Sequence, residues 1–155
     1  DVRMTSQVTR QTIDLNSLLA RAKNSAAGAV LLFSGDVRNH SEGRAVDFLE
    51  YETHESMAQK QIAEIVVEAK NRWDLHYVEV IHRFGKMQIS DCSIGIVVAS
   101  SHRKDAYAAS RFIIDTVKKS VPIWKKEHFT NGQAIWIEGC EASSVAELNK
   151  SSAAT

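Results

Sequence analysis

The period of the hydrophobic pattern changes after Tyr51, and this change limits the fold more than any other feature of the sequence. Val46 and Phe48 are two residues apart, as in a strand, and with the aromatic Tyr51 they suggest a strand that ends near residue 51. From about Ser56, apolar residues recur at steps of three and four, which places them on one face of a helix. That face consists of Ala58, Ile62, Ile65, Val66, Ala69 and Trp73. A chain that changes from strand to long helix and then back to strand combines both kinds of secondary structure.

Two apolar runs predict buried strands on either side of this helix. Residues 28–37 contain GAVLLF, and residues 93–100 read SIGIVVAS. A second long helix is predicted over residues 102–120, and it ends before Pro122, the only proline in the chain.

Shorter elements fill the rest of the pattern. The turn SEGR, residues 41–44, is expected to join the strand at 28–37 to the next strand as a hairpin. A strand at residues 77–83 is expected to end before Gly85. Near the N-terminus we predict a strand at 7–13, followed by a brief helix that is capped by Asp14 or Asn16 and runs to Ala26. Near the C-terminus we predict strands at 123–128 and 134–138, joined around the turn Asn131-Gly132. The tail ending KSSAAT is expected to be frayed.

Composition narrows the class of protein. A chain of 155 residues with 44% hydrophobic and 25% charged residues is typical of one globular domain, residues 1–155. Nineteen basic and nineteen acidic residues cancel, which disfavours a general nucleic-acid binder. No apolar stretch approaches the roughly 20 residues of a membrane span and no signal peptide is visible, so we expect a cytoplasmic protein. Cys92 and Cys140 form no CxxC pair, so no redox motif or zinc knuckle is indicated.

Common catalytic motifs are missing from the sequence. It contains no GxGxxG, GxxxxGK[ST] or GxSxG. The segment HESMA, which begins at His54, fails as a zinc-protease motif because Ala58 stands where the second histidine would be. The six histidines show no ligand spacing, so no metal site is predicted.

The segment FSGDVRNH, residues 33–40, places polar side chains at the end of an apolar strand. One interpretation is structural: Gly35 allows a bend, and Asn39 and His40 begin a loop. The other is that the strand ends at a binding site, with Arg38 among its residues. The segment alone does not decide between them.

The segment SSHRKDAY puts His102 and Arg103 in the first turn of a helix. A cation there loses about 0.3–1 kcal/mol of favourable dipole interaction. The same place suits a bound phosphate, because free N–H groups and an arginine can converge on it. Arg38 could belong to such a cluster, although each arginine alone could equally be an ordinary surface residue.

A polar stripe on the same helix carries Lys104, Arg111, Asp115 and Lys118, and its default interpretation is a solvated face. The chain then turns at Pro122, and VPIWKKEHF can return Lys125 toward the helix end that carries Lys118. Two amines that meet can disfavour each other's charge, which favours the neutral, nucleophilic form.

Seven segments together resemble a known family. FSGDVRNHSEGRAV, LEYETHESMA, EAKNRW, VIHRFGKM, ASSHRKDAY, FIIDTVK and VPIWKKE, in this order, resemble the large, catalytic subunit of molybdopterin synthase. The resemblance covers roughly residues 13–138. It implies an α+β fold of the hammerhead type, with a mixed, largely antiparallel sheet and two long helices. It also implies conversion of cyclic pyranopterin monophosphate to molybdopterin.

The resemblance assigns roles to single residues. Lys118 and Lys125 match the two catalytic lysines, of which Lys118 is expected to contact the thiocarboxylate and Lys125 to stabilise developing charge. Four further residues match substrate-binding positions: Phe33, Arg38, His102 and Arg103. No metal or cofactor is implied, because the pterin is the substrate. Some relatives carry an arginine where this chain has GCEA around Cys140, so a third basic contact there is in question.

The resemblance also implies partners. Sulfur arrives as a thiocarboxylate on the C-terminal glycine of a small ubiquitin-like subunit with a Gly-Gly tail, which this chain, ending SSAAT, is not expected to replace. That tail is expected to insert toward Lys118 beside an edge formed by VPIWKKEHF. The assembly implied is a central homodimer within a heterotetramer, without nucleic acid or membrane. The alternative function is a non-catalytic module that binds a phosphorylated ligand or a ubiquitin-like tail.

Overall fold

A four-stranded sheet forms the centre of the fold in the computed structural model, which describes residues 3–138. Its strands are β1 (Arg3–Thr9), β2 (Ala29–Asp36), β5 (Leu75–Arg83) and β7 (Cys92–Ser100), in the order β1-β5-β7-β2. β1 runs parallel to β5, and the other pairs are antiparallel. The predicted mixed, largely antiparallel sheet is therefore confirmed.

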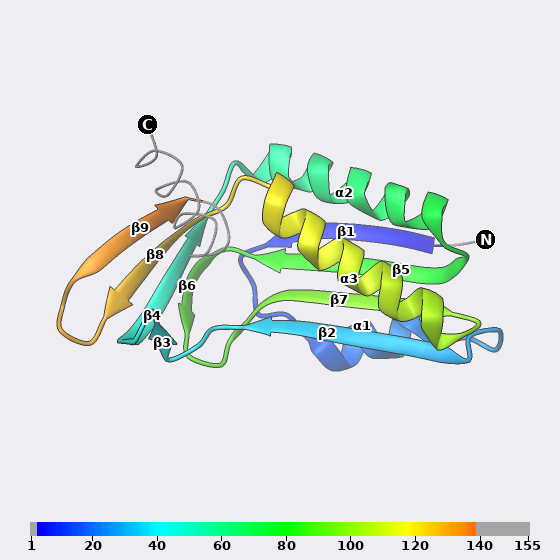
Figure 1. Cartoon of the computed structure of the whole chain (residues 1–155), viewed down its shortest axis with the longest axis horizontal. Helices are drawn as coiled ribbons and strands as arrows, with labels where there is room; N and C mark the ends of the chain where they lie inside the picture. Colours follow the sequence, from blue (N-terminus) through cyan, green and yellow to red (C-terminus); the bar gives the residue numbers. More distant parts are fainter. Residues whose placement is uncertain (1–2, 139–155) are drawn as a thin grey trace, which may run out of the picture.

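Helices cover both faces of this sheet (Figure 1). α2 (Glu55–Arg72) and α3 (Arg103–Ser120) pack on one face, and their apolar residues join those of the strands in the largest buried cluster. The shorter α1 (Leu15–Ala22) packs on the other face. The two long helices were predicted within one residue of their N-terminal ends, and the predicted face of α2 is buried from Ala58 to Ala69.

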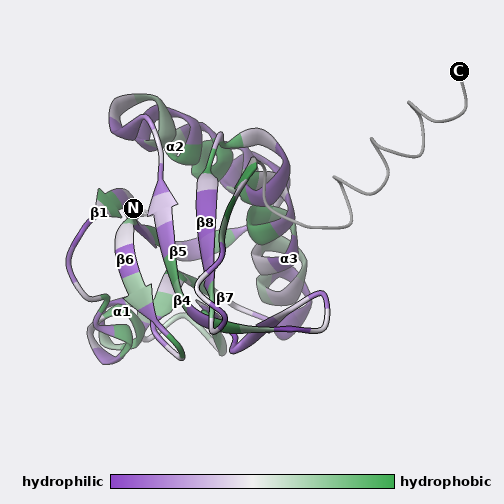
Figure 2. Cartoon of the chain, turned by 90° about the vertical axis from the view of Figure 1, so that its left-hand side faces the viewer, coloured by the Kyte–Doolittle hydropathy of each residue, from purple (hydrophilic) through white to green (hydrophobic). Residues whose placement is uncertain are grey.

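A second sheet lies beside the first. Figure 2 shows the molecule from the side on which this second sheet lies. It consists of β3 (His40–Ser41), β4 (Arg44–Glu52), β6 (Gly85–Gln88), β8 (Trp124–Phe129) and β9 (Ala134–Glu138). β8 lies between β4 and β9, and β6 pairs with β4. A small cluster of Val37, Val46, Leu49, Met87 and Phe129 forms its core. The predicted strands around Asn131-Gly132 are confirmed as β8 and β9.

The predicted hairpin between the strand at 28–37 and the next strand is wrong. β2 pairs with β7, whereas β4 pairs with β3, β6 and β8. The turn itself exists, with positive φ at Glu42 and Gly43, but it joins β4 to the two-residue β3. A turn motif specifies a reversal of the chain, and it carries no information on which longer strand continues the sheet.

Several boundaries also differ from the predictions. The first strand is Arg3–Thr9 rather than 7–13, and α1 ends at Ala22 rather than Ala26. Asp14 is its N-cap, as one of the two predicted alternatives, and accepts a hydrogen bond from the backbone N–H of Ser17 at 3.1 Å. The prediction for the tail falls outside the described residues, as does that for the surroundings of Cys140.

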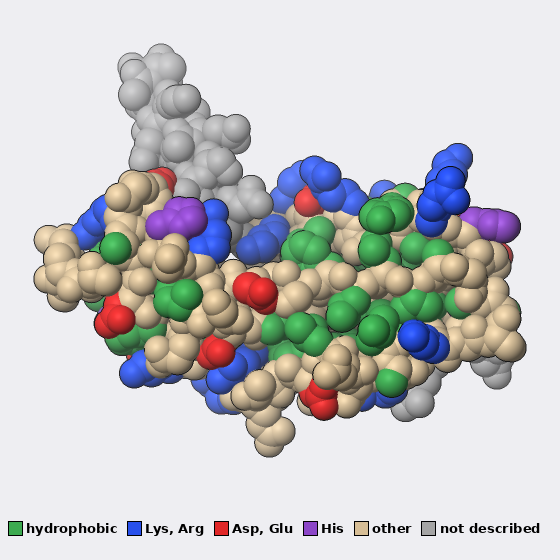
Figure 3. Space-filling view, turned by 90° about the horizontal axis from the view of Figure 1, so that it is seen from below, with side chains coloured by type: hydrophobic (Ala, Val, Ile, Leu, Met, Phe, Trp, Pro, Cys, Tyr) green, Lys and Arg blue, Asp and Glu red, His purple; other side chains and the backbone are tan. Residues whose placement is uncertain are grey.

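β2 is less buried than a core strand. Within residues 3–138 it pairs with β7 alone, so it forms one edge of the first sheet, and Ala29 to Gly35 are only partly buried. Figure 3, which looks at the molecule from below, shows hydrophobic side chains gathered on the side where β2 lies. An edge of this kind is open to pairing with another chain.

The helices of the described part of the chain include none that is long and apolar enough to cross a membrane.

Candidate active site

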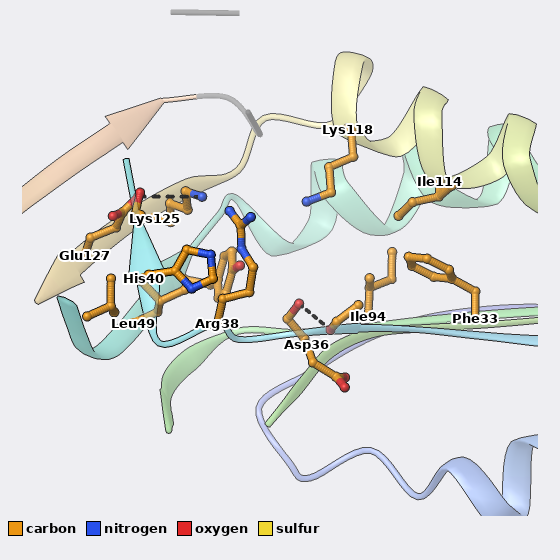
Figure 4. A pocket seen from close by; sticks show the side chains of 15 residues that line it. Phe33, Asp36, Arg38, His40, Leu49, Ile94, Ile114, Lys118, Lys125 and Glu127 are labelled. Atoms are coloured by element: carbon orange, nitrogen blue, oxygen red, sulfur yellow. Dashed lines mark hydrogen bonds and ion pairs between the residues drawn. The ribbon is translucent and has the colours of Figure 1, made fainter. Parts of the chain in front are cut away.

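A cavity of about 430 Å³ lies where the two sheets and α3 meet (Figure 4). Phe33, Ile94 and Ile114 form an apolar end, while Arg38, His40, Lys125 and Glu127 form a polar end. Lys118 projects between these two ends (Figure 4). The remaining lining residues are Gly35, Asp36, Ser41, Val46, Leu49, Tyr51 and Ser93.

Lys118 and Lys125 reach the cavity from different elements. Lys118 lies in the last turn of α3, and Lys125 is the second residue of β8. Hydrogen bonds hold two adjacent residues of the turn between them: Val121 N–H donates to Val117 O at 3.1 Å, and Thr53 Oγ1 donates to Pro122 O at 2.6 Å. The prediction that the chain returns Lys125 toward Lys118 is confirmed, because both also line a second, smaller cavity of about 20 Å³.

Arg38 follows the irregular end of β2. The register of β2 and β7 shifts between Gly35 and Asp36, and Val37 is then held by two backbone hydrogen bonds, to Asp91 O at 3.0 Å and from Ser90 N at 2.8 Å. Arg38 therefore starts from a fixed backbone, and its guanidinium points into the space between the two lysines (Figure 4). The segment bends at Asn39, and Asp36, Arg38 and His40 line the cavity. That these residues bind a ligand stays a prediction.

Gly35 lets β2 approach β7 closely at the cavity wall. A Cβ atom at this position would lie 2.7 Å from Ile94 Cγ2, which is too close for two carbon atoms. The glycine is therefore needed for close packing of the two strands, and Phe33 and Ile94 lie side by side at the apolar end (Figure 4). The bend itself lies at Asn39.

His102 and Arg103 do not line this cavity. They lie at the start of α3, while Lys118 lies in its last turn, and the rise of 1.5 Å per residue puts Arg103 and Lys118 roughly 22 Å apart along the helix. His102 is the N-cap residue but its side chain makes no capping hydrogen bond, and both side chains are exposed. Within one chain the expected phosphate cluster of Arg38 and Arg103 is therefore not formed.

Two neighbours of the lysines were not predicted from the sequence. Glu127 is 1% exposed, and its Oε1 lies 3.7 Å from Lys125 Nζ. His82 lines the smaller cavity with both lysines, and Phe84 stacks on its ring. Burial lowers the pKa of His82 to about 4, and the charge of Lys118 acts in the same direction. The signal for Glu127 was its position two residues after Lys125, which puts both on one face of a strand.

VPIWKKEHF does not form the expected edge. Its strand, β8, has β4 on one side and β9 on the other, so its main chain is fully engaged in the sheet. Among the described residues, β8 therefore offers an extended tail no free strand edge to pair with.

Comparisons with known proteins show to which family the chain belongs. The MoaE protein family matches residues 8–120. A molybdopterin synthase catalytic subunit from Thermoplasma volcanium is 40% identical over 130 residues, covering 84% of this chain and 95% of that protein. One from Staphylococcus carnosus is 46% identical over 114 residues, covering 74% and 75%.

Two solved structures also resemble this chain. The crystal structure of molybdopterin synthase from Staphylococcus aureus has a TM-score of 0.78 and 37% identity, covering 84% of this chain and 94% of that chain. A complex of subunits 1 and 2 of molybdopterin-converting factor from Helicobacter pylori shares the fold at a TM-score of 0.69 and 22% identity, covering 84% and 88%. The chain belongs to the MoaE protein family, the family of molybdopterin synthase catalytic subunits.

Proposed function

We propose that this chain converts cyclic pyranopterin monophosphate to molybdopterin, using sulfur from the thiocarboxylate of a small ubiquitin-like subunit. One observation carries the proposal: Arg38, Lys118 and Lys125, which follow β2, end α3 and begin β8, enter one cavity. Three cations in one cavity suit a phosphorylated substrate and an anionic sulfur donor, because each charge-assisted contact favours the anion. A structural role alone would not require them to converge.

The two lysines have different surroundings, which suits different roles. Lys118 projects between the two ends of the cavity, one turn after Ile114 of the apolar end, and we assign it the contact with the thiocarboxylate, which loses part of its hydration beside these apolar side chains (Figure 4). Lys125 lies at the polar end and is assigned to stabilise the charge that develops as sulfur adds to the pterin. In each transfer a carbon–sulfur bond to the pterin side chain forms, the carbon–sulfur bond of the thiocarboxylate breaks, and an oxygen displaced from the substrate or supplied by water completes the carboxylate of the carrier. The two sulfurs of the dithiolene therefore consume two loaded carriers.

The partner in this proposal is a small subunit whose C-terminal Gly-Gly tail enters the cavity. The complex of two subunits solved for the protein from Helicobacter pylori gives a precedent in a molecule of this fold. Because β8 is paired on both sides, the tail gains contacts from the cavity walls at Phe33 and Ile114 rather than from that strand. The proposal includes the cytoplasmic location and the absence of a resident cofactor expected from the sequence.

A homodimer would bring His102 and Arg103 to the site. Ala29 lies opposite Ser100, so the start of β2 is close to the start of α3, and the end of β2 leads to Arg38. If two copies pair their β2 edges antiparallel about a two-fold axis, the start of one β2 lies beside the end of the other. Arg103 of one copy then approaches Arg38 of the other, which is the cluster that a single chain does not form.

Reconstitution tests the proposed function. Purified chain, thiocarboxylated small subunit and cyclic pyranopterin monophosphate are expected to yield molybdopterin, and a small subunit without its terminal Gly-Gly is expected to yield none while still associating in part. Binding of both partners without any product would instead support the non-catalytic module.

A further inference from the structure

The carboxylate of Glu127 is buried at the polar end of the cavity. Among the residues that the structure describes, neither Oε1 nor Oε2 accepts a hydrogen bond. The ion pair with Lys125 is 3.7 Å long, which exceeds hydrogen-bond distance. A buried carboxylate without donors is strongly unfavourable, so the geometry indicates that N–H groups reach it from a molecule that enters the cavity.

The charges around Glu127 indicate what kind of group this molecule presents. Arg38, Lys118 and Lys125 provide the contacts that a phosphate needs, whereas the carboxylate of Glu127 repels any anion. The part of the ligand that faces Glu127 must therefore carry hydrogen-bond donors. A carboxylate has two coplanar oxygens, so two parallel N–H groups on neighbouring atoms fit it best.

We propose that Glu127 is a substrate-binding residue that accepts hydrogen bonds from N3–H and the 2-amino group of the pterin ring. This inference rests on the proposed function, because it takes cyclic pyranopterin monophosphate as the substrate. These two groups are neighbouring donors on one edge of the pterin, as the carboxylate requires. Glu127 and Phe33 lie at opposite ends of the cavity with Lys118 between them (Figure 4), so this contact directs the reacting end of the substrate toward Lys118.

Access to Glu127 depends on Lys125. The Lys125 side chain is 16% exposed and lies over the same face of β8. Rotation about its single bonds uncovers the carboxylate, and the pterin N–H groups then replace the ammonium as partners of Glu127. Lys125 is thereby released toward the substrate, which couples recognition of the ring to placement of the second amine.

The test compares the precursor with its 2-oxo analogue, in which a carbonyl replaces the 2-amino group. Calorimetric titration of the unmodified protein should show tighter binding of the precursor by about 10- to 100-fold, because the analogue turns an acceptor toward the carboxylate. Glu127→Gln should lose this preference, since the amide offers one donor and one acceptor. Glu50→Gln is the matched control: Glu50 contacts His128 at 3.2 Å on the second sheet and does not line the cavity.

Each outcome separates this inference from the proposed function. If the unmodified protein does not bind the precursor, the proposed function fails. If it binds precursor and analogue equally, or if Glu127→Gln keeps the preference, Glu127 does not contact the pterin. An equal loss of affinity for both compounds in Glu127→Gln would also overturn the inference, because it would mean that Glu127 acts only through Lys125.

Discussion

Ala29 of β2 lies opposite Ser100 of β7, and this pairing places Arg38 and Arg103 at opposite ends of the two strands. Lys118 and Lys125, to which the proposed function assigns catalysis, line the same cavity as Arg38. Arg103 can serve the same reaction only from a second copy of the chain. The homodimer in the proposed function therefore predicts an active site that two copies share.

A mixture of two inactive variants tests this shared site. Lys118→Ala and Arg103→Ala should each lose most activity as homodimers. In a mixed dimer, one site combines the intact Lys118 of one copy with the intact Arg103 of the other, while the second site carries both defects. Random exchange of subunits should thus restore up to about a quarter of the unmodified activity in a reconstitution assay.

The control is a mixture of Lys118→Ala with Lys125→Ala, because both lysines come from one chain and line one cavity. No mixed dimer of that pair contains an intact site, so activity should stay lost. Recovery in the control, or no recovery in the test mixture despite exchange, would contradict a site shared through Arg103.

Arg38→Ala should weaken binding of the precursor by roughly 1.5–3 kcal/mol, since it removes a charge-assisted contact from a guanidinium that points into the cavity. Association with the small subunit should change much less. Calorimetric titration measures both affinities. If the affinity for the precursor is unchanged, Arg38 does not contact its phosphate.

The long helices and the lysine pair could be predicted because their signals are local. The helical period from Ala58 to Ala69 and the stop at Pro122 depend only on neighbouring residues. Pro122 also limits the direction of the chain after α3, so the approach of Lys125 to Lys118 could be predicted from the short segment that joins them.

Strand pairing and the positions of Arg103 and Glu127 could not be predicted in the same way. The register that separates Arg38 from Arg103 arises from contacts between residues about 70 apart in the sequence, and no local pattern encodes it. The sequence places Glu127 on the same face of β8 as Lys125, but it does not show that this face borders a cavity.

Gly35→Ala should destabilise the protein by about 1–3 kcal/mol, because the new Cβ would overlap Ile94 Cγ2. Urea unfolding measures this loss. The double variant Gly35→Ala/Ile94→Ala should lose less than the sum of the two single losses, since Ile94→Ala removes the overlapping methyl group. If the losses of unfolding free energy in the two single variants add up to the loss in the double variant, the new Cβ does not overlap Ile94.

Acid should destabilise the protein through His82. Its folded-state pKa of about 4 lies below the ordinary value of 6.5, so the unfolded chain binds the proton first as pH falls. The stabilisation is complete above about pH 6.5 and is lost toward pH 4, where the difference reaches about 3 kcal/mol.

Urea unfolding at pH 7 and pH 4.5 measures this effect. His82→Asn should show a weaker dependence on pH than the unmodified chain, because the titrating group is gone. His76→Asn, at the outer end of β5, is the control and should keep the dependence. An equal pH dependence in His82→Asn and the unmodified chain would assign the acid sensitivity to other groups.

The central claim is that Lys118 takes part in sulfur transfer, and the reconstitution assay with Lys118→Ala measures it most directly. Lys119→Ala is the matched control, because Lys119 is the adjacent, exposed residue of α3 and does not line the cavity. Lys118→Ala should unfold within about 0.5 kcal/mol of the unmodified protein, yet form molybdopterin at least about 100-fold more slowly, whereas Lys119→Ala should retain full activity. Near-normal product formation by a folded Lys118→Ala protein would contradict the account.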